Sequence, residues 1–134
     1  MGVKAVHLEI RGRQVVDLSD LPLMRSRIHG TSYWVSDEDR RQYGGRTYVL
    51  LREPKNPHDP NAVAVYGRGR KVGYVSAGRA AAIAPILDQI GADAYRVSGE
   101  GVSRNSLRLW VGVPKVDGLR RLASGRASAE NPKG

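Results

Sequence analysis

The sequence predicts a single domain of the mainly β class. Its 134 residues are enough for one hydrophobic core, and 40% of them are apolar. The 16 Gly and 7 Pro residues divide the chain into short segments, several of which are rich in the β-branched and aromatic residues that favour strands. The chain has no Cys, so packing and backbone pairing must stabilise the fold without disulfides.

The first part of the chain, residues 1–26, is predicted to add a β-hairpin to the domain. Residues 3–10 and 14–18 alternate loosely between apolar and polar side chains. Gly12 and Arg13 stand between these two runs, where a short turn would join them.

Two predicted strands flank a charged loop in the next part of the chain. Residues 27–35 contain Ile, Thr, Tyr, Trp and Val, and residues 47–51 are almost continuously apolar. Between them, residues 36–46 are rich in charge and contain a Gly-Gly pair, which predicts a loop. Residues 53–61 contain three prolines, and each fixes its own φ and keeps the preceding residue extended. A loop stiffened in this way loses little entropy when a ligand docks on it.

The second half of the chain combines strands with one predicted helix, residues 78–90. Pro85 predicts a kink in this helix or its division into two short pieces. Residues 117–134 are small, polar and basic, which predicts a disordered tail. The helix presents one apolar face at three- and four-residue spacing, formed by Ala80, Ile83, Ala84, Leu87 and Ile90. The remaining predicted strands are residues 62–66, 71–75, 94–102 and 106–113.

The charge of the chain favours a polyanionic partner. The 22 Lys and Arg residues outnumber the 13 Asp and Glu residues, which gives a net charge of +9. Most of the cations are Arg, which can hold a phosphate with two hydrogen bonds and can stack on a base. An Arg-rich surface that is merely solvated is the alternative interpretation.

The same sequence argues against several other classes of protein. Its N-terminus lacks the continuous apolar stretch of a signal peptide or a membrane span, so we expect a cytoplasmic, nucleoid-associated protein and no membrane partner. The three histidines are scattered along the chain and do not suggest a zinc site. We expect no cofactor, no metal and no small-molecule substrate.

Three motifs in the middle of the chain resemble the HIRAN domain family. They are Gly30-Thr-Ser-Tyr-Trp34, the run Arg-Glu-Pro-Lys-Asn-Pro-His-Asp-Pro-Asn-Ala that begins at Arg52, and Lys71-Val-Gly-Tyr-Val75. The resemblance extends over residues 27–114, and its most specific part is the proline-rich run. It implies a small closed OB-like β-barrel of about six strands with one or two short helices. We therefore expect a HIRAN-like domain over residues 27–116.

The resemblance also implies a function: binding of single-stranded DNA at 3′-hydroxyl ends in DNA repair or replication-fork processing, without catalysis. Repair or replication proteins would be further partners. Tyr33 matches an aromatic residue that holds a terminal base, and Asp59 matches a carboxylate that meets the free hydroxyl. Three positions depart from the family pattern, because His58 replaces a second aromatic residue, Ser32 an Arg and Ala77 a Lys.

The physical chemistry of such a site is coherent. An aromatic ring stacks on any base and contributes about 1–3 kcal/mol. A carboxylate accepts a hydrogen bond from a terminal hydroxyl but repels a phosphate in the same place, so Asp59 would distinguish an end from an interior nucleotide. Asp59 and Asn61 would alternatively only cap the turn with their own side chains.

The predicted DNA-binding residues come from the loop, a groove beside it and a basic hairpin. Because neighbours on a strand point to opposite sides, one of Tyr33 and Trp34 is expected in the core. The resemblance assigns Tyr33 to the groove and Trp34 to the core. Arg68, Arg70 and Lys71 are predicted to contact phosphates. The full set is Tyr33, Arg52, Asn56, His58, Asp59, Asn61, Arg68, Arg70, Lys71 and Tyr74. By the resemblance, Arg52, Asn56 and Asn61 match residues that frame the loop.

Two other functions stay open on the sequence alone. Asp39, Glu53 and Lys55 have the spacing of a metal-dependent nuclease, although Pro54 interrupts the regular strand that such a site needs. An exposed strand edge beside the basic hairpin would also suit a protein-interaction adaptor.

Overall fold

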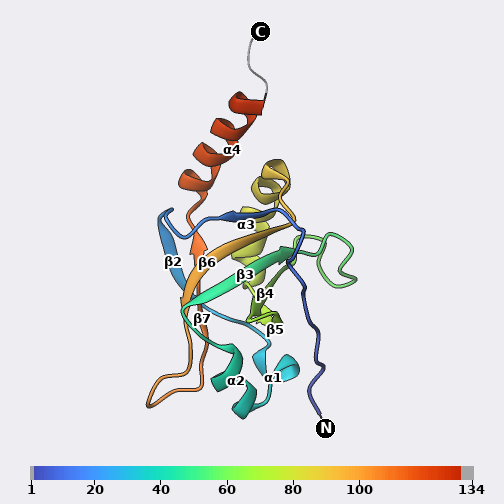
Figure 1. Ribbon diagram of the computed structural model, residues 1–134, viewed down its shortest axis with the longest axis vertical. Helices are drawn as coiled ribbons and strands as arrows, with labels where there is room; N and C mark the ends of the chain where they lie inside the picture. The colour runs from blue at the N-terminus through green and yellow to red at the C-terminus, as the bar shows by residue number, and fades with distance from the viewer. Residues whose placement is uncertain (1, 131–134) are drawn as a thin grey trace.

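The computed structural model describes residues 2–130 of the chain. Within this range, seven strands form one curled sheet and four helices pack around it (Figure 1). The mainly β prediction is therefore confirmed, although the helices outnumber the expected one or two. The strands are β1 Val15–Asp17, β2 Leu23–Arg27, β3 Thr47–Arg52, β4 Val63–Gly67, β5 Arg70–Tyr74, β6 Ala94–Glu100 and β7 Trp110–Pro114. The helices are α1 Thr31–Trp34, α2 Asp37–Tyr43, α3 Ala77–Ile90 and α4 Val116–Glu130.

The sheet curls into a form consistent with an OB-like barrel. Its strand order is β2-β7-β6-β3-β4-β5, with antiparallel neighbours, and β1 pairs with β6 in parallel. At the seam, the His29 N–H donates to the Tyr74 carbonyl at 2.8 Å and the Tyr74 N–H donates back to the His29 carbonyl at 2.9 Å. Gly73 permits this approach, because its φ is +155° and a Cβ there would lie 2.7 Å from Ile28 Cγ2. The His29–Tyr74 bridge thus joins β5, at one end of the strand order, to the segment that follows β2, at the other end.

The hydrophobic core lies between the curled sheet and α3. Every residue of β4 is buried, and the apolar face predicted for the helix is buried as well. Pro85 stands on the opposite, exposed face, and α3 is one uninterrupted helix rather than two pieces. Pro85 cannot donate a hydrogen bond to the Ala81 carbonyl, but both residues are exposed, so water can satisfy that carbonyl.

The predicted N-terminal hairpin is wrong, because its two segments pair with different strands. Residues 15–17 form β1 and pair with β6. Residues 4–8, called the N-terminal strap below, instead follow the edge of β5. There the Leu8 N–H donates to the Gly69 carbonyl and the Lys71 N–H donates to the Val6 carbonyl, both at 2.7 Å. An unpaired strand edge offers regular donors and acceptors, and both segments use such edges.

The predicted strand at residues 27–35 and the predicted loop at residues 36–46 are also wrong. The chain turns at Gly30, whose φ is +73°, and then forms α1. Helix α2 follows, with Ser36 as its N-cap in a reciprocal capping box with Asp39. Acidic residues in the first turn and basic residues in the last turn of α2 complement the helix dipole.

The predicted disordered tail is wrong over most of its length, because residues 116–130 form α4. Leu119 and Ala123 are buried, and α4 packs against α3. Figure 1 shows both helices toward one end of the molecule, with α1 and α2 toward the other. Residues 131–134, which the predicted tail also included, lie outside the described residues. No helix in the described part of the chain is both long and apolar enough to span a membrane.

Candidate functional site

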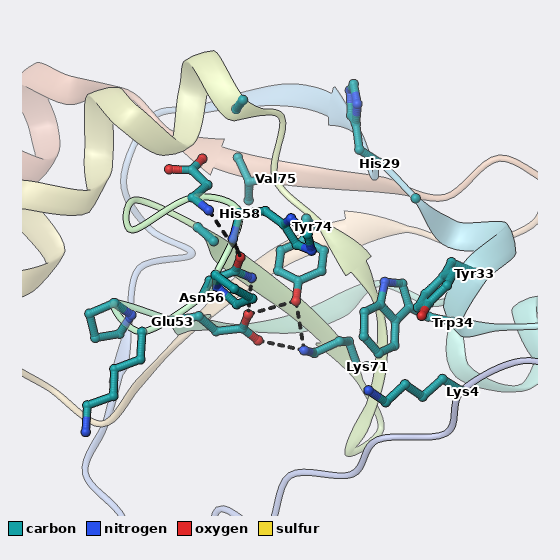
Figure 2. Close-up of a pocket in the computed structure, with 17 residues that line it drawn as sticks. Lys4, His29, Tyr33, Trp34, Glu53, Asn56, His58, Lys71, Tyr74 and Val75 are labelled. Carbon is teal, nitrogen blue, oxygen red and sulfur yellow. Dashed lines mark hydrogen bonds and ion pairs between the residues drawn. The ribbon is translucent and has the colours of Figure 1, made fainter.

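An open cavity of about 1090 Å³ lies beside the seam of the sheet. Its walls come from α1, from β5, from the proline-rich loop at residues 53–61 and from the first residue of α3. Figure 2 shows the side chains of Tyr33, Trp34, Glu53, Lys71 and Tyr74 gathered around it. The cavity therefore brings together the aromatic motif and the loop motif that the sequence analysis singled out.

One wall of the cavity is aromatic. Tyr33 is 62% exposed, and its ring centroid lies 5.0 Å from that of Trp34 in an edge-on arrangement. The Trp34 ring in turn lies 5.9 Å from the Tyr74 ring. Trp34 lines the cavity and is only partly buried, so its assignment to the core is wrong. Neighbouring side chains on a helix are about 100° apart rather than opposite, so both rings can border one cavity.

The floor of the cavity is a closed triangle of polar groups. The Lys71 Nζ lies 2.6 Å from Glu53 Oε2 and 3.0 Å from the Tyr74 hydroxyl, which donates to Glu53 Oε1 at 2.7 Å. Burial raises the pKa of Glu53, but hydrogen bonds from Lys71, Asn56 and Tyr74 outweigh it, so the pKa lies below its ordinary value. Burial, together with the hydrogen bond to Glu53, raises the pKa of Tyr74. Glu53 is therefore an anion, and Tyr74 is neutral near pH 7.

Side-chain-to-backbone hydrogen bonds shape the proline-rich loop. Asn56 Oδ1 accepts from the N–H groups of His58 and Asp59 at 2.8 and 3.2 Å. Asp59 Oδ1 accepts from the Asn61 N–H at 2.8 Å, so Asp59 does cap the turn. Asp59 also lines the cavity, and its Oδ2 has no hydrogen-bond partner among the described residues. Capping therefore occupies one carboxylate oxygen and leaves the other for a ligand.

Arg52 connects the proline-rich loop to α3 on the side away from the cavity. Its guanidinium makes a two-pronged ion pair with Asp88, with distances of 2.9 and 3.0 Å. It also donates to the carbonyls of Ala62 and Pro60 at 2.7 and 3.0 Å. Neither Arg52 nor Asn61 lines the cavity, so both would act on a ligand only through the position of the loop.

The basic hairpin contributes less to the cavity than the sequence suggests. Arg70 is 6% exposed and faces away, donating to the Trp34 carbonyl at 3.1 Å and to Asp39 at 3.4 Å. It thus holds α1 and α2 against the sheet. Arg68 is exposed at the hairpin tip and does not line the cavity either. Of the three predicted phosphate contacts, only Lys71 is a lining residue, and Glu53 already pairs with its charge.

Several residues that line the cavity do not belong to the DNA-binding set predicted from the sequence. Lys4 belongs to the N-terminal strap, where its N–H donates to the Tyr33 carbonyl at 3.2 Å and its Nζ lies 5.9 Å from the Trp34 ring. Lys55 lines the cavity as well, from the proline-rich loop. No local signal marks Lys4, because its place depends on pairing with a strand far along the chain. His29 and Glu53 also line the cavity.

The carboxylates of the nuclease-like triplet serve separate purposes. Asp39 caps α2 and contacts Arg70, whereas Glu53 pairs with Lys71. Among the described residues, no three His, Asp or Glu side chains lie close enough together to hold a metal ion. The geometry therefore does not assemble the acidic cluster that a metal-dependent nuclease requires.

Comparison with known sequences identifies the family. Residues 23–112 match the HIRAN domain. This chain belongs to the HIRAN domain family. The match includes the aromatic wall, the proline-rich loop and β5, but it excludes the N-terminal strap and α4. A search of curated proteins gives no match.

Three solved structures are similar to this chain. A crystal structure of a protein from Lactobacillus plantarum is 20% identical, with a TM-score of 0.52, over 83% of this chain and 94% of that chain. The crystal structure of the HIRAN domain of human HLTF is 20% identical, with a TM-score of 0.42, over 81% and 88% of the two chains. An NMR structure of the HLTF HIRAN domain in its DNA-bound conformation is 24% identical, with a TM-score of 0.46, over 79% and 85%. At 20% identity and a TM-score of 0.52, the likeness to the Lactobacillus plantarum protein bears on the fold alone.

Proposed function

We propose that this HIRAN domain is a non-catalytic module that binds the 3′-hydroxyl end of single-stranded DNA in DNA repair or replication-fork processing. One observation carries the proposal: Tyr33 and Asp59 line the same open cavity, so one ligand can touch both. Membership of the HIRAN family and the net charge of +9 support it. A protein with this role works beside the nucleoid.

The cavity offers a separate group for each part of a strand terminus. The exposed ring of Tyr33 gives a stacking surface for a base, with Trp34 beside it. Asp59 Oδ2 accepts a hydrogen bond from the terminal hydroxyl, and its charge repels a terminal phosphate. Lys4 and Lys55 on the cavity walls are placed to meet the phosphates that precede the end.

Replacing Asp59 with Asn tests the recognition of the end. In Asp59→Asn the amide oxygen can still accept the Asn61 N–H, so the turn keeps its cap. The other oxygen becomes an NH₂ donor, which accepts nothing from a hydroxyl and no longer repels a phosphate. We expect the unsubstituted protein to prefer 3′-hydroxyl over 3′-phosphate oligonucleotides in fluorescence anisotropy titrations, and the variant to lose this preference. An unchanged preference would remove Asp59 from the proposed role.

Tyr33→Ala tests the stacking surface in the same titrations. Because the ring is largely exposed, the substitution leaves the core intact. We expect it to weaken the binding free energy for both 3′-hydroxyl and 3′-phosphate oligonucleotides by about 1–3 kcal/mol. Tyr33→Phe keeps the ring and serves as the matched control, with affinity close to that of the unsubstituted protein. Equal affinities for the Ala and Phe variants would contradict the proposal.

The two alternative functions are less well supported. The edge of β5, which an adaptor would offer to a partner, is covered in part by the N-terminal strap. Incubation of the same oligonucleotides with magnesium or manganese tests for nuclease activity, for which we expect no cleavage.

A further inference from the structure

A second hollow, of about 440 Å³, lies on another part of the molecule. It is formed by the connection from α2 to β3 and the connection from β6 to β7. Three arginines line it: Arg41, Arg46 and Arg104. Among the described residues, no Asp or Glu lines this hollow, in contrast to the cavity that contains Glu53 and Asp59.

The two connections are held together by the Tyr48 side chain and by close backbone packing. The Tyr48 hydroxyl accepts from the Gly45 N–H at 3.1 Å and donates to the Glu100 carbonyl at 2.9 Å, so one side chain ties both connections. Gly101 packs directly against Gly44 and Gly45, because a Cβ at Gly101 would lie 2.9 Å from backbone atoms of both. Only glycine permits so close an approach. Residues almost sixty positions apart in the sequence are therefore held side by side.

Each of the three arginines stands on ordered backbone. Arg41 lies in the last turn of α2. The Arg46 carbonyl accepts from the Gly99 N–H at 2.9 Å, immediately before β3. Arg104 lies in a two-residue turn that is closed by a hydrogen bond from the Ser103 N–H to the Ser106 carbonyl at 3.0 Å. The backbone that carries these three cations is therefore already ordered, so binding of a ligand costs little backbone entropy.

Of the carboxylates near these arginines in sequence, Asp37 pairs with Arg40 and Asp39 with Arg70, and Glu38 lies one helical turn before Arg41. No ion pair within 4 Å joins any of the three to an acidic group in the described chain. Glu100, the acid nearest to the hollow in sequence, is bound by Arg25 at 2.6 and 3.3 Å. A concave surface lined by one sign of charge concentrates the potential there and attracts anions.

We propose that this hollow, the arginine hollow, is a second nucleic-acid site that holds phosphodiester groups of the strand whose 3′ end occupies the cavity. The inference rests on the proposed function. Successive helices line the two sites, α1 the cavity and α2 the hollow, and only two residues separate these helices. A strand whose end occupies the cavity would first pass α2, which is about 10 Å long at 1.5 Å per residue, so only nucleotides several positions before the end would reach the hollow. The carboxylate-bearing cavity reads the end, and the arginine hollow holds the backbone without reading sequence.

A triple variant, Arg41→Gln with Arg46→Gln and Arg104→Gln, tests the arginine hollow. The control variant, Arg11→Gln with Arg13→Gln and Arg120→Gln, removes the same charge from exposed positions elsewhere. Both are titrated with 3′-hydroxyl oligonucleotides of about 4 and about 16 nucleotides, which bracket the site sizes of OB folds. We expect the triple variant to bind the longer strand about tenfold more weakly and the shorter strand normally. Its salt dependence should lose about 2 units of slope, since each single-strand phosphate contact contributes about 0.7.

The outcomes separate the inference from the proposed function. Equal losses in the triple and control variants would overturn the arginine hollow, as would an equal loss for both strand lengths. If the unsubstituted protein does not bind the shorter strand while the longer strand still depends on the three arginines, the proposed end-binding function fails. The hollow then remains a phosphate-binding site, but its link to a strand end in the cavity is overturned. Thermal unfolding of each variant checks that it is folded. If the triple variant is unstable, a double variant with only Arg41→Gln and Arg104→Gln replaces it.

Discussion

Glu53 organises the cavity through contacts with three other side chains. Its carboxylate is bound by Lys71, Tyr74 and Asn56, and the Lys71 side chain is only 7% exposed. Removing the carboxylate would leave a largely buried cation without its partner, which is costly. Glu53 therefore matters for stability first, and it affects binding through the positions of Lys71 and Tyr74.

Glu53→Gln is expected to lower the free energy of unfolding at pH 7 by about 1–3 kcal/mol. Because the folded-state pKa of Glu53 lies below its ordinary value of 4.5, its contribution is present above pH 4.5 and is lost as the pH falls through the folded pKa. The difference between the two proteins should therefore shrink in acid. Urea unfolding at a series of pH values measures it. Glu100→Gln, which breaks an exposed ion pair with Arg25, is the control and should cost less than about 1 kcal/mol.

The predictability of each site residue depends on how local its position is. Asn56 and Asp59 follow from the sequence because their side chains bind backbone groups two or three residues away. Trp34 does not, because its direction depends on α1, a helix of one turn in a segment rich in strand-forming residues. Lys4 reaches the cavity only because the strap pairs with β5, and Arg70 is turned away by Asp39 of α2.

Among the elements, the strap is the one that adds to the cavity from outside the family match. Its hydrogen bonds with Gly69, Lys71 and Tyr33 fix its course, and Lys4 points toward Trp34 (Figure 2). Deleting residues 2–8 should therefore weaken oligonucleotide binding while leaving the sheet folded. Lys4→Gln should reproduce most of the loss and reduce the slope of log K against log salt by about 0.7. Fluorescence anisotropy at several salt concentrations measures both, with Arg13→Gln as the control. If both variants bind oligonucleotides normally, the strap has no role in binding and only covers the edge of β5.

Elements with strong local patterns were predictable, and elements that depend on tertiary packing were not. Strands β3, β4 and β5 and helix α3 agree with the runs of strand formers and with the three- and four-residue spacing. For α2 a local signal did exist, since Ser36 and Asp39 have capping-box spacing and acidic residues precede basic ones. The parallel pairing of β1 with β6 leaves no such trace, because the two strands are far apart in sequence.

At the scale of the whole molecule, the folded unit is larger than the family match, because α4 completes the core next to α3. The composition of this segment obscures the helix, because the apolar residues Leu119, Leu122 and Ala123 that follow Val116 occur among Gly, Ser and Arg. Their three- and four-residue spacing is nevertheless that of a helix with one buried face.

Leu119→Ala tests whether α4 belongs to the cooperative fold. Leu119 is fully buried, so the substitution should lower the free energy of unfolding by about 2–5 kcal/mol through lost burial and the cavity left behind. Arg120→Ala, on the exposed side of the same helix, should change it by less than about 0.5 kcal/mol. Urea unfolding followed by circular dichroism measures both. Identical curves for the two variants would mean that α4 contributes nothing to stability, as expected of a disordered tail. A single transition shifted only by Leu119→Ala would show that α3 and α4 unfold together with the sheet, because a two-state domain loses all of its packing at once.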